Sequence, residues 1–465
     1  MNENYLKLCK KYKVCGVSIA SVDKNGKNFF QYGIRNESSE MIEKDTIFRI
    51  ASISKTFVMI CAMILVEQGK MKLDDDISTL LGYRVRNPFF EDDVITLEML
   101  MTQTSSIADG YDDEDPKNDK QTRGYNNVNM MGTKTYISLK DLLTNKDYEY
   151  YTDLDFHKCR PGSEFHYSNF GCGILAMVVE TVSNELFTVF AKKHIFDKLN
   201  LDASFRMPDI KRKDLVSGTF SINEEGISTI RCKSEFFTSG NPLIHPIGDN
   251  FRGPAGGVYI SMEGLLKYMS IYLNNGTSED GVKVVEKETM DEILRMHWYN
   301  DKGVTEGYNA KGLQLKISDT VDTNYIIGHT GSAYNIYSFM FFDVEKQKGM
   351  CFITNGLMYK IANNKVKGVF NVLFHDFMSE FFGKEENDYT IKINKKGIYL
   401  NDRYISNKLD IMSVASALRT IPFEGKLLSP KGKYIEYNDD VISMFNKMGL
   451  TFTLVNKEYL IKYRR

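Results

Sequence analysis

Apolar and polar residues alternate in short runs at both ends of the first 385 residues. Two runs near the N-terminus, residues 14–22 and 28–34, flank an Asn25-Gly26 pair of the kind that joins hairpin strands. Further alternating runs come late in this region, at residues 325–330, 336–342 and 350–354. The pattern predicts an antiparallel sheet to which both ends of the region contribute strands.

The segment between these strands, about residues 74–207, carries apolar residues mainly at helical spacing. Residues 109–129 interrupt it with acidic and amide side chains, and we expect an exposed loop there. Helices are also predicted from residue 52 to near Gly69 and over residues 364–382. The expected fold is therefore α/β (α+β): an antiparallel sheet flanked by helices, with an inserted mainly helical subdomain.

The composition changes at residues 383–388, which are mostly charged or amide residues. Beyond this point, residues 389–405 alternate as a pair of strands, and residues 450–463 alternate as a second hairpin. We expect residues 1–385 to form the main domain, with its helical insertion at about 74–207. Residues 388–465 would then form a small appended C-terminal α+β module.

The charge balance excludes a nucleic-acid partner, because 59 basic and 61 acidic residues leave a net charge of -2. The most apolar run, residues 57–66, is about half the length needed to span a bilayer. The first residues lack the apolar stretch of a secretory signal, so we expect a cytoplasmic protein. Seven cysteines without a C-x-x-C pair argue against a disulfide framework or a zinc knuckle. The sequence leaves the oligomeric state unknown.

One candidate for chemistry is the S-x-x-K motif Ser52-Ile53-Ser54-Lys55, which precedes the apolar helix. Residues three apart share a helix face, so the Ser52 hydroxyl and the Lys55 amine can meet. The helix N-terminus stabilises negative charge, and a buried lysine loses its proton more readily than an exposed one. The alternative is that Ser52 is a helix cap and Lys55 is solvated.

A second candidate is Tyr167-Ser168-Asn169, which follows a Pro-Gly turn and precedes an apolar helix. A phenol ionised by nearby cations can accept a serine proton and return it later. The Asn169 amide can hydrogen-bond a substrate carbonyl or hold a lysine. The alternative for Tyr167 is an ordinary core tyrosine.

A third candidate is His329-Thr330-Gly331-Ser332, at the end of a predicted strand. Gly331 would let a substrate backbone approach the strand closely. The backbone N–H of Ser332 could pair with that of Ser52 as an oxyanion hole. The alternative for His329 is a structural histidine.

Together, these three motifs resemble those of the serine β-lactamase and penicillin-binding-protein superfamily. The closest resemblance is to its class C β-lactamase-like branch, with DD-peptidase, esterase and D-aminopeptidase relatives. Flanking segments at residues 48–57, 95–106, 253–261 and 328–356 are similar as well, so the resemblance spans about residues 14–382.

The resemblance implies that residues 1–385 are a β-lactamase/transpeptidase-like catalytic domain. It implies a Ser52 nucleophile, with Lys55 and Tyr167 sharing general acid/base duty. The substrate-binding residues that it implies are Asn169, His329, Thr330, Gly331 and Ser332.

Three positions depart from the family pattern. His329 replaces the lysine of K-T-G, so a permanent cation becomes a group that is mostly neutral near pH 7. This weakens the expected grip on a substrate carboxylate and argues against a dedicated β-lactamase. Gln103 and Ser106 replace a usual histidine and glycine, and we expect them to affect local packing rather than chemistry.

We therefore predict a serine hydrolase that acts on an amide or ester through a Ser52 acyl-enzyme, without a cofactor or metal. Its partner would be a small-molecule or peptide substrate: a peptide, a D-amino-acid derivative or a small ester. The acidic run at residues 74–76 is better explained by a helix start than by a metal site. The alternative is a non-catalytic scaffold or ligand-sensing protein that retains this fold.

Overall fold

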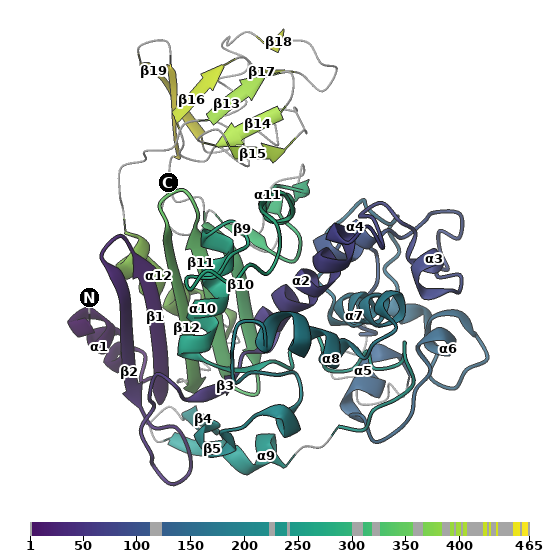
Figure 1. Ribbon diagram of the computed structural model, residues 1–465, viewed down its shortest axis with the longest axis horizontal. Coiled ribbons are helices and arrows are strands. Elements are labelled where there is room, and N and C mark those ends of the chain that lie inside the picture. Colours follow the sequence, from purple (N-terminus) through teal and green to yellow (C-terminus); the bar gives the residue numbers. More distant parts are fainter. Residues whose placement is uncertain are drawn as a thin grey trace.

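The computed structural model describes residues 2–111, 123–222, 228–239, 242–299, 310–318, 326–356 and 366–383, together with the backbone of the strands between 391 and 463. Its main feature is an eight-stranded antiparallel sheet in the order β2-β1-β12-β11-β10-β9-β8-β7 (Figure 1). The strands are β1 (Gly16–Asp23), β2 (Gly26–Gly33), β7 (Trp298–Tyr299), β8 (Ala310–Lys311), β9 (Lys316–Ser318), β10 (Ile326–Ala333), β11 (Ile336–Asp343) and β12 (Lys348–Gly356).

The sheet joins the two ends of the main region, as the alternating runs predict. Strand β1 pairs with β12, placing Val17 opposite Thr354 and Ile19 opposite Phe352. The β1–β2 hairpin closes with Asp23 opposite Gly26, whose φ of +106° suits glycine. The predicted antiparallel α/β (α+β) architecture is confirmed.

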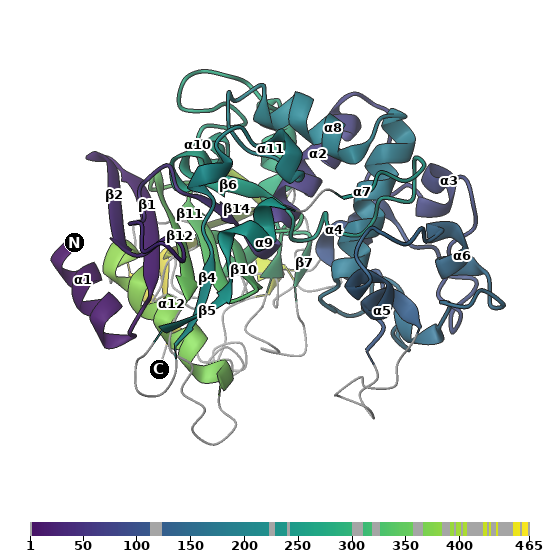
Figure 2. The same ribbon diagram turned by 90° about the horizontal axis from the view of Figure 1, so that it is seen from below.

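Helices lie on both faces of the sheet (Figures 1 and 2). Each face buries its own hydrophobic core. Helices α1 (Asn2–Lys11) and α12 (Val366–Phe382) pack on one face, where the rings of Tyr5 and Phe377 stack 5.9 Å apart. Helix α10 (Met262–Leu273) packs on the other face, where Met269 contacts Cys351. Because side chains alternate along each strand, one run of β residues supplies both cores.

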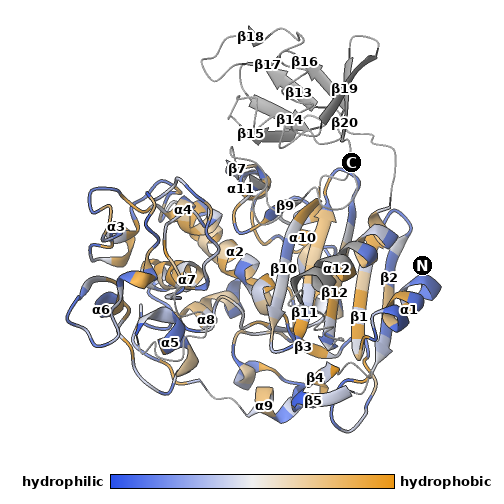
Figure 3. Ribbon diagram, turned by 180° about the vertical axis from the view of Figure 1, so that it is seen from behind, coloured by the Kyte–Doolittle hydropathy of each residue, from blue (hydrophilic) through white to orange (hydrophobic). Residues whose placement is uncertain are grey.

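The segment around residues 74–207 is helical, as predicted. Its elements are α3 (Ile77–Leu81), α4 (Leu97–Thr102), α5 (Gly124–Met130), α6 (Leu139–Thr144), α7 (Asn169–Ser183) and α8 (Phe187–Ala191). Helix α7 packs against α2 (Ser54–Glu67), and both are mostly buried and apolar around their circumference (Figure 3). This pair connects the helical segment to the sheet and carries two of the candidate motifs at its N-termini.

Shorter elements complete the main region. Strands β3 (Ile47–Arg49) and β6 (Tyr259–Ser261) form a ribbon just before the S-x-x-K motif. The other short elements are β4 (Thr219–Ile222), β5 (Ser228–Cys232), α9 (Ser234–Thr238) and α11 (Lys287–Leu294).

A second, six-stranded mixed sheet lies in the C-terminal region, in the order β15-β14-β13-β16-β20-β19. Its strands are β13 (Ile391–Asn394), β14 (Gly397–Leu400), β15 (Arg403–Ser406), β16 (Pro422–Gly425), β19 (Leu450–Val455) and β20 (Glu458–Tyr463), beside a small pair, β17 (Leu427–Leu428) and β18 (Tyr434–Ile435). Both predicted strand pairs, β13–β14 and β19–β20, are confirmed. The proposed division into residues 1–385 and 388–465 remains a prediction.

The expectation of an exposed loop over residues 109–129 is wrong at both of its described ends. Residues 124–130 form α5, in which Tyr125 and Val128 are buried. Asp109 is only partly exposed and accepts hydrogen bonds from the start of α7. Residues 112–122 lie outside the described residues.

No single helix in the described part of the chain has the length and apolar composition needed to cross a membrane. The pair formed by α7 and residues 187–196 meets those criteria jointly, with a bend of 83° between its halves. The cytoplasmic location remains a prediction.

Candidate active site

Ser52 lies in a single 3₁₀ turn, Ala51–Ile53, between β3 and α2. Ala51 has a φ of +50°, a left-handed conformation that costs a residue with a Cβ about 1–2 kcal/mol. The edge of β10 lies directly beside this turn: a Cβ added to Gly331 would lie 2.5 Å from the Ile50 carbonyl oxygen and 3.1 Å from the Ser52 backbone nitrogen. A strained turn and a strand glycine therefore bring the backbones at Ser52 and Gly331 together.

The helix-cap alternative for Ser52 is wrong. Ile53 occupies the N-cap position of α2, and no side chain caps the helix. The Ser54 hydroxyl instead accepts a hydrogen bond from the Val258 N–H, 3.0 Å away. The Ser52 hydroxyl is left to interact with Lys55.

Lys55 is fully buried, and its amine makes three hydrogen bonds. The nitrogen lies 3.1 Å from the Ser52 Oγ, 2.8 Å from the Asn169 Oδ1 and 2.8 Å from the Ala255 carbonyl oxygen. An ammonium has three donors, so these three acceptors match its hydrogen-bonding capacity. The S-x-x-K motif, the Y-x-N motif and the loop at residues 253–257 thus converge on one nitrogen.

Asp109 supports the Asn169 side chain through hydrogen bonds. Asp109 was not identified as a site residue from the sequence. Its Oδ2 accepts the Asn169 amide N–H at 2.7 Å. Its Oδ1 accepts the Ser168 hydroxyl at 3.0 Å and the Phe170 N–H at 2.9 Å, at the start of α7. Because the Asn169 amide nitrogen donates to the Asp109 carboxylate, the Asn169 amide oxygen faces Lys55 and accepts its hydrogen bond.

Tyr167 is half-buried and lies beside the same amine. The Lys55 nitrogen is 4.8 Å from the centre of the phenol ring, within the range of a cation–π contact. The Tyr167 ring centre is 6.4 Å from that of His329 on β10. Tyr167 is therefore not a core tyrosine, and it lies between the helical segment and the sheet.

His329 is buried and neutral. Its Nδ1 lies 2.5 Å from the Thr330 carbonyl oxygen, an acceptor, so Nδ1 carries the proton. Burial lowers the pKa of His329 well below its usual value, and the charges of Lys311, Lys316 and Lys55 lower this pKa further. Its Nε2 has no hydrogen-bond partner among the described residues.

Two buried lysines behind His329 were also missed by sequence reasoning. Lys311 on β8 and Lys316 on β9 face each other across the strand pair. The Lys316 amine donates to the Thr330 hydroxyl at 2.6 Å. Burial, and then the charge of Lys55, lowers the pKa of Lys311 to about 7. Burial, and then the charge of Lys311, lowers the pKa of Lys316 well below its usual value.

Gln103 and Ser106 make local structural contacts. Both adopt positive φ, +60° and +62°, so Ser106 keeps the left-handed conformation that favours glycine. The Gln103 amide donates to the side chain of Gln314 at 3.0 Å, and the Ser106 hydroxyl accepts from Asn87 at 2.9 Å. These contacts support the expectation of an effect on packing.

An aromatic surface lies beside the site. Tyr334 follows Gly331 by three residues, and the Arg49 guanidinium lies 4.8 Å from its ring centre. The Phe236 ring is 5.7 Å from that of Tyr334, and these two side chains are 54% and 45% exposed. They provide an exposed apolar surface at the end of β10.

The acidic run at residues 74–76 has structural contacts. Asp75 accepts the Lys72 N–H at 2.7 Å. Asp76 caps α3 through the Ser78 N–H and pairs with the Arg86 guanidinium at 2.6 Å. All seven cysteines are free thiols.

Comparison with known proteins places this chain in a family. The family model described as Beta-lactamase matches residues 3–363. Protein flp of Staphylococcus aureus (strain N315) is 27% identical over 231 residues, which are 49% of this chain and 41% of that protein. The D-alanyl-D-alanine-carboxypeptidase/endopeptidase AmpH of Escherichia coli (strain K12) is 25% identical over 267 residues, 56% of this chain and 58% of that protein. The chain thus spans about two fifths of the length of the staphylococcal protein that it matches.

Solved structures share the fold. The octameric penicillin-binding protein homologue from Pyrococcus abyssi aligns with a TM-score of 0.57 at 18% identity, over 99% of this chain and 94% of that one. The D-amino acid amidase from Ochrobactrum anthropi SV3 aligns with a TM-score of 0.58 at 16% identity, over 81% of this chain and 98% of that one. The predicted family resemblance is confirmed: the chain belongs to the Beta-lactamase family, and it shares its fold with a penicillin-binding protein homologue and an amidase.

Proposed function

We propose that the protein is a serine hydrolase that cleaves an amide or ester through an acyl-enzyme on Ser52. The observation that carries the proposal is the fully buried Lys55 amine, hydrogen-bonded to both Ser52 and Asn169. Burying an amine is costly, and a protein that only needed the fold for scaffolding would gain nothing from it. An amine beside a serine hydroxyl is the arrangement that activates a nucleophile.

The contacts of Lys55 suggest how the proton moves. An ammonium that donates to three acceptors has no lone pair with which to take the Ser52 proton. The Ser52 hydrogen is then available to Tyr167, whose ring lies beside the positive charge. In this scheme, Tyr167 acts as its phenolate: its oxygen accepts the proton as the Ser52 oxygen attacks the carbonyl carbon, and it becomes a phenol. It then returns the proton to the leaving amine or alcohol, while Lys55 stabilises the phenolate.

The backbone at Ser52 and at β10 would stabilise the oxyanion. The close approach of Gly331 to the Ser52 nitrogen supports a hole formed by the N–H groups of Ser52 and Ser332. Deacylation follows when water attacks the same carbonyl carbon, with Tyr167 as the base. Asn169, His329 and Thr330 would line the substrate pocket.

The substrate is inferred from the β10 side of the site. A neutral His329 gives weak attraction for a carboxylate beside the scissile bond, and the Phe236–Tyr334 surface favours an apolar group. Small esters, D-amino-acid amides and short peptides with an apolar side chain fit these features better than a β-lactam carboxylate. Relatives described as an amidase and as a carboxypeptidase/endopeptidase support acyl transfer from such substrates.

A substrate panel tests the proposal. Purified protein is assayed with chromogenic esters, D-amino-acid amides and a chromogenic cephalosporin, alongside Ser52→Ala and the control Ser38→Ala. Ser38 is an exposed serine outside the candidate site. We expect turnover of esters and amides over cephalosporin, lost only in Ser52→Ala. Equal turnover by Ser52→Ala would refute the proposal.

A further inference from the structure

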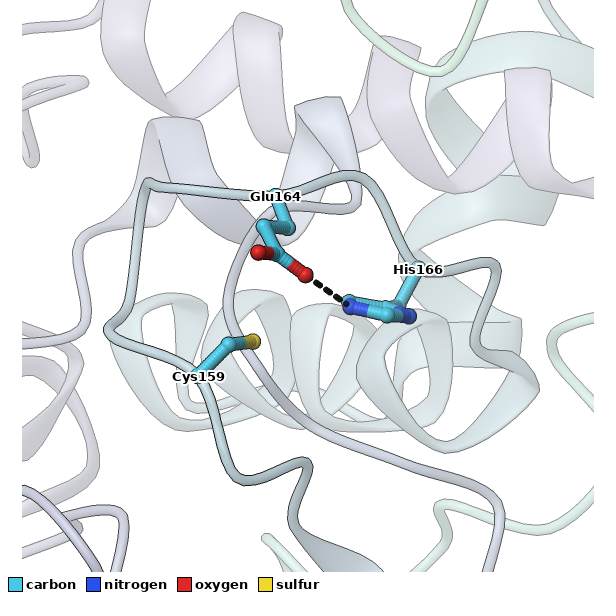
Figure 4. A group of neighbouring side chains, drawn as sticks. All are labelled: Cys159, Glu164 and His166. Atoms are coloured by element: carbon cyan, nitrogen blue, oxygen red, sulfur yellow. Dashed lines mark hydrogen bonds and ion pairs between the residues drawn. The ribbon is translucent and has the colours of Figure 1, made fainter. Parts of the chain in front are cut away.

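Three potential metal ligands gather on the loop that leads into Tyr167. One donor atom from each of Cys159, Glu164 and His166 lies within 4.8 Å of the other two (Figure 4). The His166 Nε2 lies 3.3 Å from a Glu164 carboxylate oxygen. Cys159 and His166 are partly buried, and Glu164 is exposed, so one side of the group is open to solvent.

The loop is fixed by hydrogen bonds at both of its ends. The amide of the buried Asn87 donates to the carbonyl oxygens of His157 and Cys159, at 2.8 and 3.2 Å. At the other end, the His166 N–H donates to the Gln103 carbonyl oxygen at 2.9 Å. These contacts hold the backbone that carries the thiol and the imidazole, so little chain entropy is lost if a ligand joins the two.

The basic side chains on either side of Cys159 have other contacts. The Lys158 amine lies 5.4 Å from the Phe89 ring centre. Arg160 forms an ion pair with Asp93 at 2.8 Å. A metal ion binds cysteine as the thiolate, so its binding would displace the Cys159 proton.

We propose that Cys159, Glu164 and His166 bind one zinc ion, with water in the fourth position. Thiolate, imidazole and carboxylate are all ordinary zinc ligands, at about 2.0–2.3 Å from the metal. A tetrahedral site with these bond lengths places its ligand atoms roughly 3.3–3.8 Å apart. The present separations of up to 4.8 Å therefore close by about 1 Å, within reach of side-chain rotation.

The position of the site suggests that zinc regulates the hydrolase. His166 directly precedes Tyr167, so a zinc ion held by His166 would restrain the backbone that carries the phenol. We expect hydrolysis to fall as zinc binds. This second step rests on the proposed function, whereas zinc binding itself does not.

Zinc titration by calorimetry tests the binding site directly. The parent protein should bind one equivalent and release a proton, seen as a dependence of the heat on buffer ionisation enthalpy. Cd²⁺ should give a thiolate charge-transfer absorption in the ultraviolet. Cys159→Ser should abolish this band and weaken zinc binding at least about tenfold, whereas the control Cys232→Ser should behave as the parent.

The exposed Glu164→Gln provides a second variant if Cys159→Ser does not fold, and it should also weaken zinc binding. Parent-like binding by these variants would overturn the site. For regulation, zinc should inhibit ester hydrolysis by the parent but not by Cys159→Ser. Binding without inhibition would retain the site and overturn the regulation. A parent without any hydrolase activity would refute the proposed function and leave the calorimetric result standing.

Discussion

Gly331→Ala is expected to remove most activity by separating β10 from Ser52. The added Cβ would lie 2.4 Å from the Ser338 Oγ and 2.5 Å from the Ile50 carbonyl oxygen. Ser338 cannot move freely, because its hydroxyl donates to that same carbonyl at 2.9 Å. Since ordinary contacts to a Cβ begin near 3.4 Å, the strand must shift by about 1 Å.

The size of the effect follows from the proposed oxyanion hole. Its donors work at about 2.7–3.1 Å, so a shift of about 1 Å removes one of them. Loss of one donor costs roughly 10²–10³ in kcat, or about 3–4 kcal/mol of transition-state stabilisation. Overpacking should also lower the free energy of unfolding by about 1–3 kcal/mol.

Gly256→Ala is a matched control beside the same turn. Its added Cβ would meet atoms of Ala51 at 3.7–3.9 Å, which is ordinary van der Waals contact. Acylation rates with a chromogenic ester, measured beside urea denaturation, separate the two effects. If folded Gly331→Ala acylates as fast as Gly256→Ala, the role of the β10 backbone in oxyanion binding is wrong.

Three other changes test separate parts of the site. Asp109→Asn places an amide N–H against the Asn169 amide and leaves a buried donor without its acceptor, at a cost of about 1–3 kcal/mol. We therefore expect kcat/KM to fall about 5–150-fold. Circular dichroism should show that the variant keeps its fold. Tyr167→Phe should slow acylation about 10²–10⁴-fold while ester binding changes little, measured by single-turnover kinetics, and an unchanged rate would assign the proton to another group. Lys311→Met should stabilise the protein near pH 7. Because the pKa of Lys311 is lowered in the folded protein, the unfolded chain binds more protons between about pH 7 and 10.5. The free energy of unfolding of the parent should therefore rise in that window, relative to the variant, by up to about 1.4 kcal/mol per pH unit. Parallel pH profiles of the two proteins in urea denaturation would contradict this.

The sheet and the nucleophile region were predictable because their signals are local. Alternation identifies β1, β10, β11 and β12, and the S-x-x-K spacing places Ser52 and Lys55 on one turn. The cap interpretation failed because a serine before a helix is locally suited to capping, whereas here β3 and β6 set the chain direction. Only tertiary contacts distinguish a serine that caps the helix from one that faces the site.

The supporting groups were not predictable for a different physical reason. Asp109 lies in a polar stretch without periodicity, and its importance depends on α7, about 60 residues away. Lys311 and Lys316 lie on strands of two and three residues, too short for an alternation signal. Lysines are almost never buried without a specific environment, so a sequence reading assigns them to the surface.

Mapping the covalent adduct shows whether Ser52 is the nucleophile. The protein is treated with a fluorophosphonate probe, digested and analysed by mass spectrometry, with heat-unfolded protein as the control. We predict one adduct per folded chain, on the peptide containing Ser52, and none on unfolded protein. An adduct on a different residue would show that Ser52 is not the nucleophile. The same conclusion would follow if the folded protein hydrolysed esters while Ser52 stayed unlabelled, and if Ser52→Ala hydrolysed them equally well.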